Sequence, residues 1–316
     1  MEISKFGGEF KLIDAIVKHV KDPGIIKDYG DDAAVIKTSD PKVHQLISTD
    51  MFTDGNHFST KYFSPLEIGY KVSEATLSDI AAMGGKPKYM FISICLRKNL
   101  QIAYLRSLYR GIYNSCSHHK VLILGGDTVR NNKISCALTA VGEVSTENLC
   151  LRSSAKVGDI VKVTGELGGS NAGFIILKRE YLGHRYIKKK HLQPRCRLDL
   201  VDKIAPLANA MIDVSDGIAG DLKHICDQSG VGAEIIKQDI PISKQVIHAA
   251  RALKMNPHNF AIYGGEDFEL LYTVPEENAK KTPGTTIGRI VSGNGVTLVD
   301  RKMHTREVLK GGYEHF

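Results

Sequence analysis

The sequence predicts a mixed α/β (α+β) fold built from two domains. Apolar runs of strand length alternate with segments of helical periodicity along the chain. A polar stretch over residues 145–156 interrupts this alternation and resembles a linker. The chain has 316 residues and is 42% hydrophobic, which is enough to build two cores. We therefore expect one domain at residues 1–145 and the other at residues 146–316.

Strands and helices alternate in the first half. Helical spacing of apolar residues predicts a helix over 10–20, which Asp22-Pro23-Gly24 ends. A stronger helix starts at Ser64-Pro65-Leu66-Glu67, with a capping serine, a proline at the first helical position and a glutamate three residues after the cap. We expect it to run to about Met83, where Gly84-Gly85 ends it. The other expected elements are strands at 33–37, 43–47, 89–96, 121–124 and 134–144 and a helix at 103–117.

The second half continues the alternation. A glycine-rich turn over residues 165–170 lies between a predicted strand and a predicted helix, where backbone amides can receive a phosphate. One such turn is weak support for a phosphate site. The expected strands are 159–164, 210–214, 268–274, 286–290 and 295–299, and the expected helices are 171–182, 195–208, 217–228 and 244–253.

Carboxylates recur at the ends of the predicted apolar runs. Adjacent carboxylates repel by roughly 4 kcal/mol at 4 Å, so a fold that gathers them needs a cation or protons. Oxygen ligands alone favour Mg²⁺, which takes further oxygens from water and a substrate phosphate. Turns and helix caps explain any single motif equally well, but not the whole set. The motifs are Gly30-Asp31-Asp32, Ser48-Thr49-Asp50, Gly125-Gly126-Asp127, Asp213-Val214-Ser215-Asp216-Gly217 and Gly264-Gly265-Glu266-Asp267.

Asp79 belongs to the predicted helix that starts at Ser64. Helical spacing places it on the same side as Val72, Ala75 and Met83, toward the core. A buried carboxylate without a partner is costly, so we expect Asp79 either to bind a metal or to join a hydrogen-bonded network.

Composition narrows the class of protein. The six cysteines stand far apart without a Cys-x-x-Cys pair, which predicts buried free thiols and argues against a zinc or redox site. No apolar run is long enough for a membrane span, and residues 1–5 lack the core of a signal peptide. The net charge of +7 suits anionic substrates. We expect a cytoplasmic protein with no membrane partner.

One segment is strongly basic. Residues 178–197 carry eight lysines and arginines against Glu180 alone. An RNA-binding patch would explain this charge, but Tyr181 and Tyr186 do not form a series of stacking aromatics. A solvated helix end with its loop is the better interpretation, and we expect no nucleic-acid partner.

Several phosphate-transfer and hydrolase signatures are missing. The chain has no Gly-x-x-x-x-Gly-Lys-Ser/Thr, because Gly85-Lys86 is followed by Pro87. It also lacks the protein-kinase His-Arg-Asp and Asp-Phe-Gly motifs, a Gly-x-Ser-x-Gly elbow and a His-Glu-x-x-His zinc motif. Of the classes considered, the sequence still fits phosphate chemistry that depends on metal ions and acidic side chains.

These motifs, taken together and in order, resemble the thiamine-monophosphate kinase family, within the superfamily of aminoimidazole ribonucleotide synthetases and their relatives. The resemblance covers nearly the whole chain. Besides the acidic motifs above, it includes Gly55-Asn56-His57, Leu77-Ser78-Asp79-Ile80-Ala81-Ala82-Met83-Gly84, Thr128, Phe268-Glu269-Leu270 and Gly312-Tyr313-Glu314-His315-Phe316.

The resemblance implies a reaction and a set of site residues. ATP would phosphorylate thiamine phosphate directly, with several Mg²⁺ ions, and a potassium requirement stays open. Asp50, Asp127 and Asp216 would be catalytic. The implied Mg²⁺ ligands are Asp32, Ser48, Thr49, Asp50, Asp79, Asp127, Asp213 and Asp216; the implied ATP contacts are Gly126, Asp127, Arg152 and Ser215; and the implied thiamine phosphate contacts are His57, Glu266 and Tyr313.

Some of these roles have simpler alternatives. His57 could be an ordinary loop histidine, and Tyr313 could only pack the C-terminal segment. Asp31 should point away from Asp32 on an extended segment, so one of the pair could cap the loop instead of binding metal. The family usually has aspartate where this chain has Gly169, which leaves the role of that turn in doubt.

The resemblance also implies an architecture. The N-terminal α/β domain would pair with its twin to close a β-barrel across a homodimer, and the C-terminal domain would have a ferredoxin-like core. Another enzyme of the superfamily or an inactive nucleotide-binding relative are the alternatives. The relatives that need an N-terminal or C-terminal reactive cysteine fit poorly, since the first cysteine is Cys95 and the last residue is Phe316.

Overall fold

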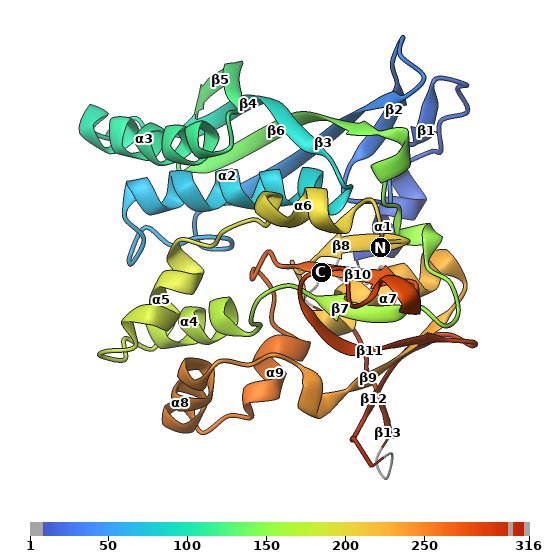
Figure 1. The fold of residues 1–316 in the computed structure, drawn as a ribbon. Helices are drawn as coiled ribbons and strands as arrows, with labels where there is room; N and C mark the ends of the chain where they lie inside the picture. Colours follow the sequence, from blue (N-terminus) through green and yellow to red (C-terminus); the bar gives the residue numbers. More distant parts are fainter. Residues whose placement is uncertain (1–8, 303–305, 313–316) are drawn as a thin grey trace.

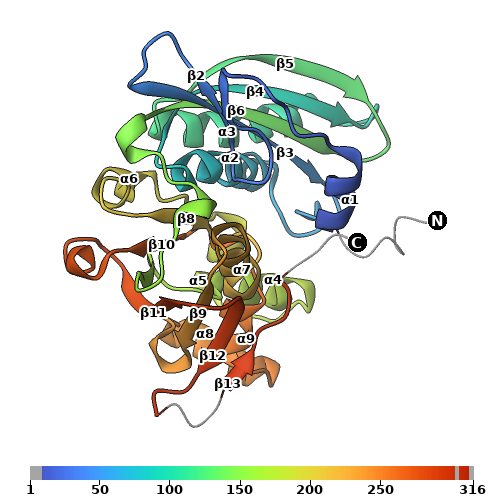
Figure 2. The same ribbon diagram turned by 90° about the vertical axis from the view of Figure 1, so that its right-hand side faces the viewer.

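The structure is a computed structural model that describes residues 9–302 and 306–312. It contains two β-sheets, one from each half of the chain, with helices between and around them (Figure 1). A second view shows the same arrangement, with strands β1 to β6 above and β7 to β13 below (Figure 2). The predicted mixed α/β class is therefore correct.

The first half forms a six-stranded sheet in the order β1-β2-β3-β6-β4-β5. Only β4 and β5 pair in parallel; the other neighbours are antiparallel. Helices α2 and α3 cover one face of this sheet (Figure 1). The elements are α1 (Glu9–Ile16), β1 (Ile25–Lys27), β2 (Ala34–Lys37), β3 (Val43–Thr53), α2 (Pro65–Ala82), β4 (Lys86–Leu96), α3 (Ile102–His118), β5 (Leu122–Arg130) and β6 (Ser135–Ser145).

Two strands of this sheet run past the ends that we expected. Ser48-Thr49-Asp50 lies inside β3, because each of these residues pairs with β6 in an unbroken ladder. Gly125-Gly126-Asp127 likewise lies inside β5. β5 is also an edge strand, and most of its residues are exposed. The prediction that carboxylates mark strand ends is thus wrong for these two motifs and right for Asp213.

The second half forms a seven-stranded sheet in the order β13-β12-β9-β11-β7-β10-β8. Its elements are β7 (Ile160–Val163), α4 (Gly169–Lys178), α5 (Arg185–Leu192), α6 (Leu198–Ile204), β8 (Ala210–Asp213), α7 (Ile218–Ser229), β9 (Gly232–Ile236), α8 (Lys244–Leu253), α9 (Pro257–Ile262), β10 (Leu270–Val274), β11 (Thr285–Val291), β12 (Gly295–Val299) and β13 (Arg306–Val308). Five elements, β1, β9, β13, α5 and α9, were not predicted from the sequence, and α6 is shorter than predicted.

The polar stretch 145–156 is packed rather than extended. It contains two short 3-10 helices, η2 (Thr146–Asn148) and η3 (Arg152–Ser154), and the buried Cys150. Hydrogen bonds join it to both halves, including one from the backbone N–H of Arg152 to Asp31 and one from Ser229 to the carbonyl of Arg152.

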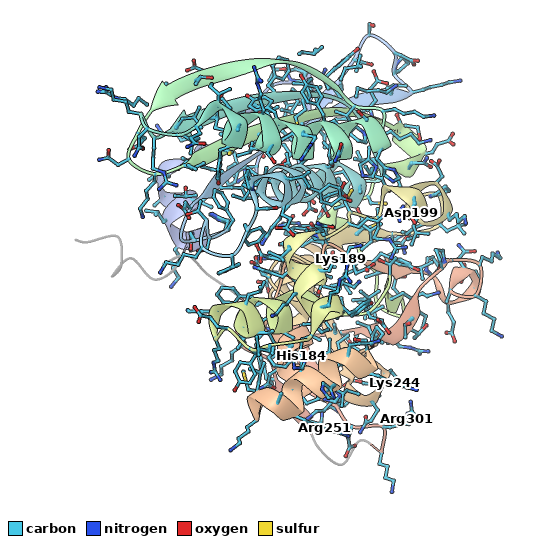
Figure 3. All side chains as sticks on the ribbon, turned by 90° about the vertical axis from the view of Figure 1, so that its left-hand side faces the viewer. His184, Lys189, Asp199, Lys244, Arg251 and Arg301 are labelled. Carbon is cyan, nitrogen blue, oxygen red and sulfur yellow. The ribbon has the colours of Figure 1, made fainter. Side chains whose placement is uncertain are left out.

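The basic segment folds mainly into the end of α4, helix α5 and their flanking loops. Lys189 and His184 are labelled in this region in Figure 3. Arg185 and Lys189 are exposed, whereas Ile187 and His191 are buried against the rest of the chain. The segment is therefore an amphipathic helix with a solvated basic face.

The cysteines are free thiols, as predicted, and all except the half-buried Cys95 are buried. Among the described residues, no helix combines the length and the apolar character that a membrane crossing requires.

Helix α2 is the central element of the fold. Its capping box is formed as predicted, because Ser64 accepts from the backbone N–H of Glu67 and the Glu67 side chain accepts from the backbone N–H of Ser64. One side of α2 packs on α3, β3 and β6, and it also contacts β8, α5 and α6 of the second half. It therefore lies between the two halves (Figure 1).

The crossing of α2 and α3 depends on two glycines. A Cβ atom at Gly69 would lie 2.0 Å from the carbonyl oxygen of Leu108, and one at Gly111 would lie 2.0 Å from that of Leu66. Real Cβ atoms do not approach backbone so closely, so a side chain here would force the helices apart.

We expect Gly111→Ala to destabilise the protein by roughly 2–3 kcal/mol, because overpacking outweighs the gain in helix propensity of about 1 kcal/mol. Urea unfolding followed by circular dichroism measures this change. Asn114→Ala, on the exposed side of α3, is the matched control and should be neutral or slightly stabilising. Equal effects of the two substitutions would show that the crossing tolerates a side chain.

Candidate active site

A cleft of about 780 Å³ opens between the two halves of the chain. α2, β3 and the loop after β3 supply one wall, and α4, α5 and the segments near the ends of β8 and α9 supply the other. Eight of the predicted site residues line it: Thr49, Asp50, His57, Asp79, Asp213, Ser215, Asp216 and Glu266. The structure thus brings together residues more than 200 positions apart in the sequence (roughly two-thirds of the chain).

Three carboxylates converge at one end of the cleft. Asp32, Asp79 and Asp213 each have a carboxylate oxygen within 4.8 Å of the others. They come from the loop before β2, from α2 and from the end of β8. The hydroxyl of Ser48 donates a hydrogen bond to Asp79, so this predicted ligand also reaches the group. We call Asp32, Asp79 and Asp213 the acid cluster.

Burial makes the charges of the acid cluster expensive. It raises the pKa of Asp213 to about 8, and the nearby Asp32 carboxylate adds to the shift. Burial likewise raises the pKa of Asp79 well above its usual range, with Asp50 as the largest neighbouring charge. Burial raises the pKa of Asp50 to about 6. These carboxylates lie close enough to oppose each other's ionisation.

One cation of the chain already touches the acid cluster. The guanidinium of Arg152 donates to both oxygens of Asp32, at 2.7 and 3.4 Å. Asp31 faces elsewhere, accepting from the backbone N–H of Arg152 at 2.8 Å and lying 3.2 Å from the ammonium of Lys27. The expectation that the two adjacent aspartates diverge is met, and Asp31 holds the loop.

The residues that follow β8 form a second acidic group. Asp221, which is buried in the first turn of α7, accepts from the backbone N–H of Asp216 through both oxygens, at 3.2 and 3.3 Å. Burial raises the pKa of Asp221 well above its usual range, and Asp216 adds to the shift. Asp221 was not among the site residues predicted from the sequence. Its only signal was a carboxylate in a first turn, which ordinary helices also show.

Close backbone packing explains the Gly264-Gly265-Glu266 motif. A Cβ atom at Gly265 would lie 1.6 Å from the carbonyl oxygen of Ser215, so only glycine fits. The backbone N–H of Glu266 donates to the same carbonyl at 2.9 Å. This contact fixes Glu266 beside Ser215 in the wall of the cleft.

A buried lysine holds the other end of the cleft. Lys71 on α2 is 1% exposed, and its ammonium lies 2.8 Å from Glu266 and donates to the carbonyl of His57 at 3.1 Å. It thus joins two of the predicted substrate contacts. Burial lowers the pKa of Lys71, and the neighbouring Glu266 opposes this shift. No motif in the sequence marks Lys71, because a single charge within a helix does not reveal its partner.

Aromatic rings line the same end. Tyr62, Phe174 and Tyr263 lie on the cleft wall together with Phe52, which makes an edge contact with the ring of His57. His191 lies 3.4 Å from Glu266 through Nδ1. This end can therefore hold a flat, partly apolar group beside a carboxylate.

The side chains of two predicted ligands, Thr49 and Asp127, point to the open face of the first sheet, although Thr49 is also among the residues that line the cleft. Side chains alternate along β3, so Ser48 and Asp50 face α2 while Thr49 faces away and bonds to Thr139. The pairing register places Asp127 in the same row as Met51, on the same side as Thr49. Gly126 and Asp127 lie on exposed β5, three strands from β3, outside the cleft. Their roles stay predictions.

Tyr313, the remaining predicted substrate contact, lies outside the described residues.

The glycine-rich turn before α4 binds a carboxylate of the chain itself. The backbone N–H groups of Gly168 and Ser170 donate to Asp267, at 2.5 and 2.9 Å. Burial raises the pKa of Asp267 to about 7, although these two hydrogen bonds oppose the shift. The amides that we considered for phosphate are thus occupied from within the chain.

The acid cluster is suited to a hard divalent cation. Its donors are all oxygens, and the buried Oδ2 atom of Asp213 has no hydrogen-bond partner. A buried carboxylate oxygen without a donor is costly, and a cation would satisfy it.

Two family models match the chain. The model for AIR synthase related protein, N-terminal domain, matches residues 30–144, and that for AIR synthase related protein, C-terminal domain, matches residues 156–301. The boundary between the two matched domains falls in the polar stretch, between residues 144 and 156.

Curated proteins with similar sequences are thiamine-monophosphate kinases. That of Aquifex aeolicus is 35% identical over 314 residues, which cover 98% of each chain. That of Bacillus subtilis is 34% identical over 331 residues, which cover 98% of this chain and 99% of the relative.

Solved structures agree in fold. AaThiL complexed with AMPPCP and TMP superposes with a TM-score of 0.90 at 33% identity, over 100% of this chain and 99% of that one. The hydrogenase maturation protein HypE in complex with ATP shares the fold with a TM-score of 0.71 at 20% identity, over 89% of this chain and 88% of that one.

The raised pKa of Asp213 predicts how stability depends on pH. Its folded pKa of about 8 lies above its ordinary value of 3.8, so the metal-free fold loses stability as pH rises from about 4 to about 8. We expect Asp213→Asn to be more stable than the wild type by roughly 2–4 kcal/mol at pH 8 in a chelator, with the difference vanishing near pH 4. Urea unfolding at both pH values measures it.

The matched control is Asp202→Asn, whose side chain is 67% exposed and which should change stability by less than about 0.5 kcal/mol at either pH. A stability difference for Asp213→Asn that is the same at pH 4 and pH 8 would contradict the charge-burial explanation.

Proposed function

The chain belongs to the thiamine-monophosphate kinase family, and from this premise we propose that it transfers the γ-phosphoryl group of ATP to thiamine phosphate, giving thiamine diphosphate and ADP. The observation that supports this most is the cleft, which joins an oxygen-only acid cluster to a partly aromatic pocket holding His57 and Glu266. One end suits charged phosphates, and the other suits a flat base.

We propose that transfer is direct and in line. Two phosphorylated molecules repel each other, so the protein must hold them close together and neutralise their charge. Among the residues lining the cleft, we see no arrangement that requires a covalent phospho-enzyme. Asp50 and Asp216, on opposite walls, would orient the reacting groups.

We propose that the acid cluster, with Ser48, Asp50 and Asp216, holds Mg²⁺. When bound, Mg²⁺ supplies positive charge that offsets the phosphate oxygens as they approach. The guanidinium of Arg152 donates to Asp32 in the structure. We propose that, when ATP binds, this guanidinium leaves the carboxylate and donates to phosphate oxygens instead. Ser215, beside the N-terminus of α7, would donate to the same phosphates. A potassium requirement remains an open part of this proposal.

The thiamine end is assigned to the Lys71 side of the cleft. Glu266, held by Lys71, can accept from an aminopyrimidine, and the aromatic wall can cover its ring. His57 is fixed by a hydrogen bond from the backbone N–H of Thr53 to Nδ1. Tyr313 is proposed as a further contact from its place in the family motif.

A coupled assay for ADP tests this function. We expect ADP release with thiamine phosphate, but not with thiamine or aminoimidazole precursors, together with formation of thiamine diphosphate. Asp50→Asn and Asp216→Asn should each lower kcat by about 100-fold or more, since their positioning effect acts on the reacting phosphates.

Asp202→Asn is again the control and should keep full activity. Circular dichroism must show that the inactive variants are folded. Unchanged turnover in both variants would remove Asp50 and Asp216 from the mechanism, whereas turnover of another acceptor would favour a different enzyme of the superfamily. ATP binding without any turnover would favour an inactive relative.

We also propose a homodimer that closes the open face of the first sheet. α2 and α3 cover one face of this sheet, while the other presents Met51, Phe91 and Leu122, which are 63%, 41% and 60% exposed. Apolar side chains at this density on a sheet face are typical of an interface. The two sheets would form the dimeric barrel, residues 1–145 would be the dimerisation domain, and residues 146–316 would complete each site around a ferredoxin-like core.

This dimer gives Gly126 and Asp127 a role. Both lie on the exposed strand β5, and Asp127 shares the open face with Met51. We propose that Asp127 serves the cleft of the second copy and not its own, which explains why it lies outside the cleft of a single chain. The buried free thiols and the use of ATP support a cytoplasmic location.

Mixing two inactive variants tests the arrangement. If Asp127 acts across the dimer, unfolded and co-refolded Asp127→Asn and Asp50→Asn chains should regain about a quarter of wild-type activity, because half of the dimers are mixed and each has one intact site. No recovery would place both residues in the same chain's site.

Phe91→Glu should yield monomers in light scattering, whereas Leu182→Glu, on an exposed loop of the other half, should leave the dimer intact.

A further inference from the structure

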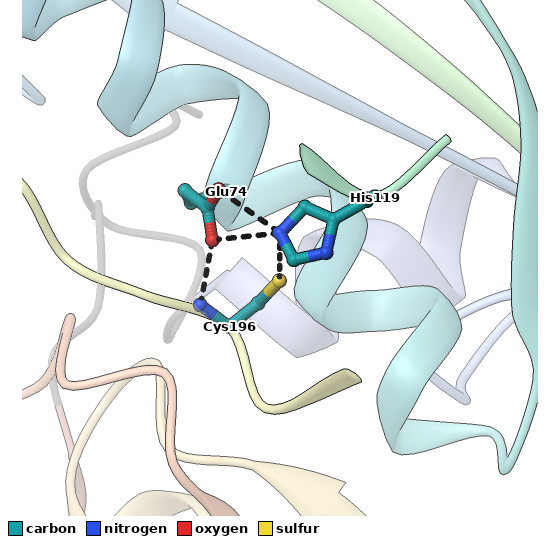
Figure 4. Close-up of side chains that lie close together, drawn as sticks. All are labelled: Glu74, His119 and Cys196. Atoms are coloured by element: carbon teal, nitrogen blue, oxygen red, sulfur yellow. Dashed lines mark hydrogen bonds and ion pairs between the residues drawn. The ribbon is translucent and has the colours of Figure 1, made fainter. Parts of the chain in front are cut away.

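A second group of metal-binding side chain types lies away from the cleft. Glu74 on α2, His119 at the end of α3 and Cys196 between α5 and α6 point toward one another (Figure 4). Glu74 and Cys196 are both 0% exposed, and His119 is largely buried. His119 follows Glu74 by 45 residues, and Cys196 follows His119 by 77, so no short motif announces the group.

The three side chains meet at a single nitrogen atom. Nε2 of His119 lies 3.1 and 3.3 Å from the two oxygens of Glu74 and 3.5 Å from Sγ of Cys196. One atom from each residue lies within 4.8 Å of the other two. None of the three residues lines the cleft described above.

Hydrogen bonding gives the three side chains partners of unequal strength. A ring nitrogen either donates or accepts, so Nε2 cannot donate to Glu74 and accept from the Cys196 thiol at once. Glu74 already accepts from the hydroxyl of Ser115 at 2.7 Å and from the backbone N–H of Cys196 at 2.9 Å. When Nε2–H donates to Glu74, the Cys196 sulfur receives only a weak, shared contact from that N–H, because sulfur is a poor acceptor.

Two of the three distances between ligand atoms match the edges of a tetrahedral zinc site, and the third is below 4.8 Å. Typical Zn–N, Zn–O and Zn–S bonds give N···O edges of about 3.4 Å and N···S edges of about 3.6 Å. The structure has 3.1 and 3.5 Å for the corresponding pairs. Sulfur and imidazole donors favour a borderline-soft cation and not Mg²⁺, which separates this group from the acid cluster.

We propose that Glu74, His119 and Cys196 form a Zn²⁺ site, with water as the fourth ligand. This proposal does not rest on the proposed kinase function. Zinc binding would displace the thiol proton of Cys196, because the thiolate is the form of cysteine that binds metal.

The site would add a metal bridge between parts of the chain that hydrogen bonds and packing already connect. It ties α2 and α3 of the first half to the loop before α6, where the neighbouring Arg197 bonds to Glu269 at 2.7 Å. Zinc bound there would stabilise the contact between the halves without taking part in phosphoryl transfer. Its effect would be to stabilise the folded chain.

Cobalt titration of the metal-free full chain tests the proposal, with excess Mg²⁺ present to occupy the acid cluster. We expect the thiolate-to-cobalt charge-transfer band and the intense visible bands of tetrahedral cobalt, both abolished by stoichiometric Zn²⁺. Cys196→Ser should lose the charge-transfer band, and His119→Gln should weaken Zn²⁺ binding by at least about 100-fold, beyond the loss expected for an outer partner.

Cys226→Ser is the matched control, because Cys226 is an equally buried free thiol on α7 and should keep the band. Zn²⁺ should raise the Tm of the wild type and of Cys226→Ser, but not that of Cys196→Ser. If Cys196→Ser fails to fold, His119→Gln gives the decisive reading. Absence of the band in the wild type, or its retention in both ligand variants, would overturn the proposal.

Discussion

Mutual repulsion between buried carboxylates is the constraint on which this structure depends. Asp32, Asp79 and Asp213 come from three distant segments and meet where the two halves of the chain touch. Ionised together in a poorly solvated site, they oppose the packing that brings them there. Arg152 offsets part of this charge through Asp32, but the orphaned oxygen of Asp213 shows that the balance is incomplete. The fold keeps this unfavourable arrangement because α2, packed on both sides, holds it in place.

The cleft separates two kinds of electrostatic environment. At one end acids outnumber cations, which suits metal-bound phosphates; at the other, Lys71 and Glu266 balance each other among aromatic rings. A ligand with a phosphate on one side and a cationic or polar ring system on the other would match both ends. Lys71 and Asp79 belong to the same helix, so α2 sets the distance between the two ends with the stiffness of a continuous backbone ladder.

Helix caps, terminal glycines and apolar periodicity predicted the bounds of individual helices and strands well, because these bounds depend on nearby residues. The cap at Ser64 and the glycines after Met83 gave the bounds of α2, and apolar periodicity gave α8 and β12. β3 ran further than expected because Ser48-Thr49-Asp50 looks like a strand exit, while β6 continues to pair with it. Repeated acids indicated the acid cluster, since their repulsion needs a common explanation. Lys71 and Asp221 gave no such signal, because a single charge in a helix does not reveal what faces it across the fold.

The alternation of side chains along β3 has a consequence for how this protein can change. Ser48 and Asp50 face the helices, and Thr49 and Met51 face the open side. Adding or deleting one residue within this strand would exchange the two sets of side chains, so that Asp50 would face outward and Met51 would face the interior. The strand itself should therefore keep a constant length in related chains.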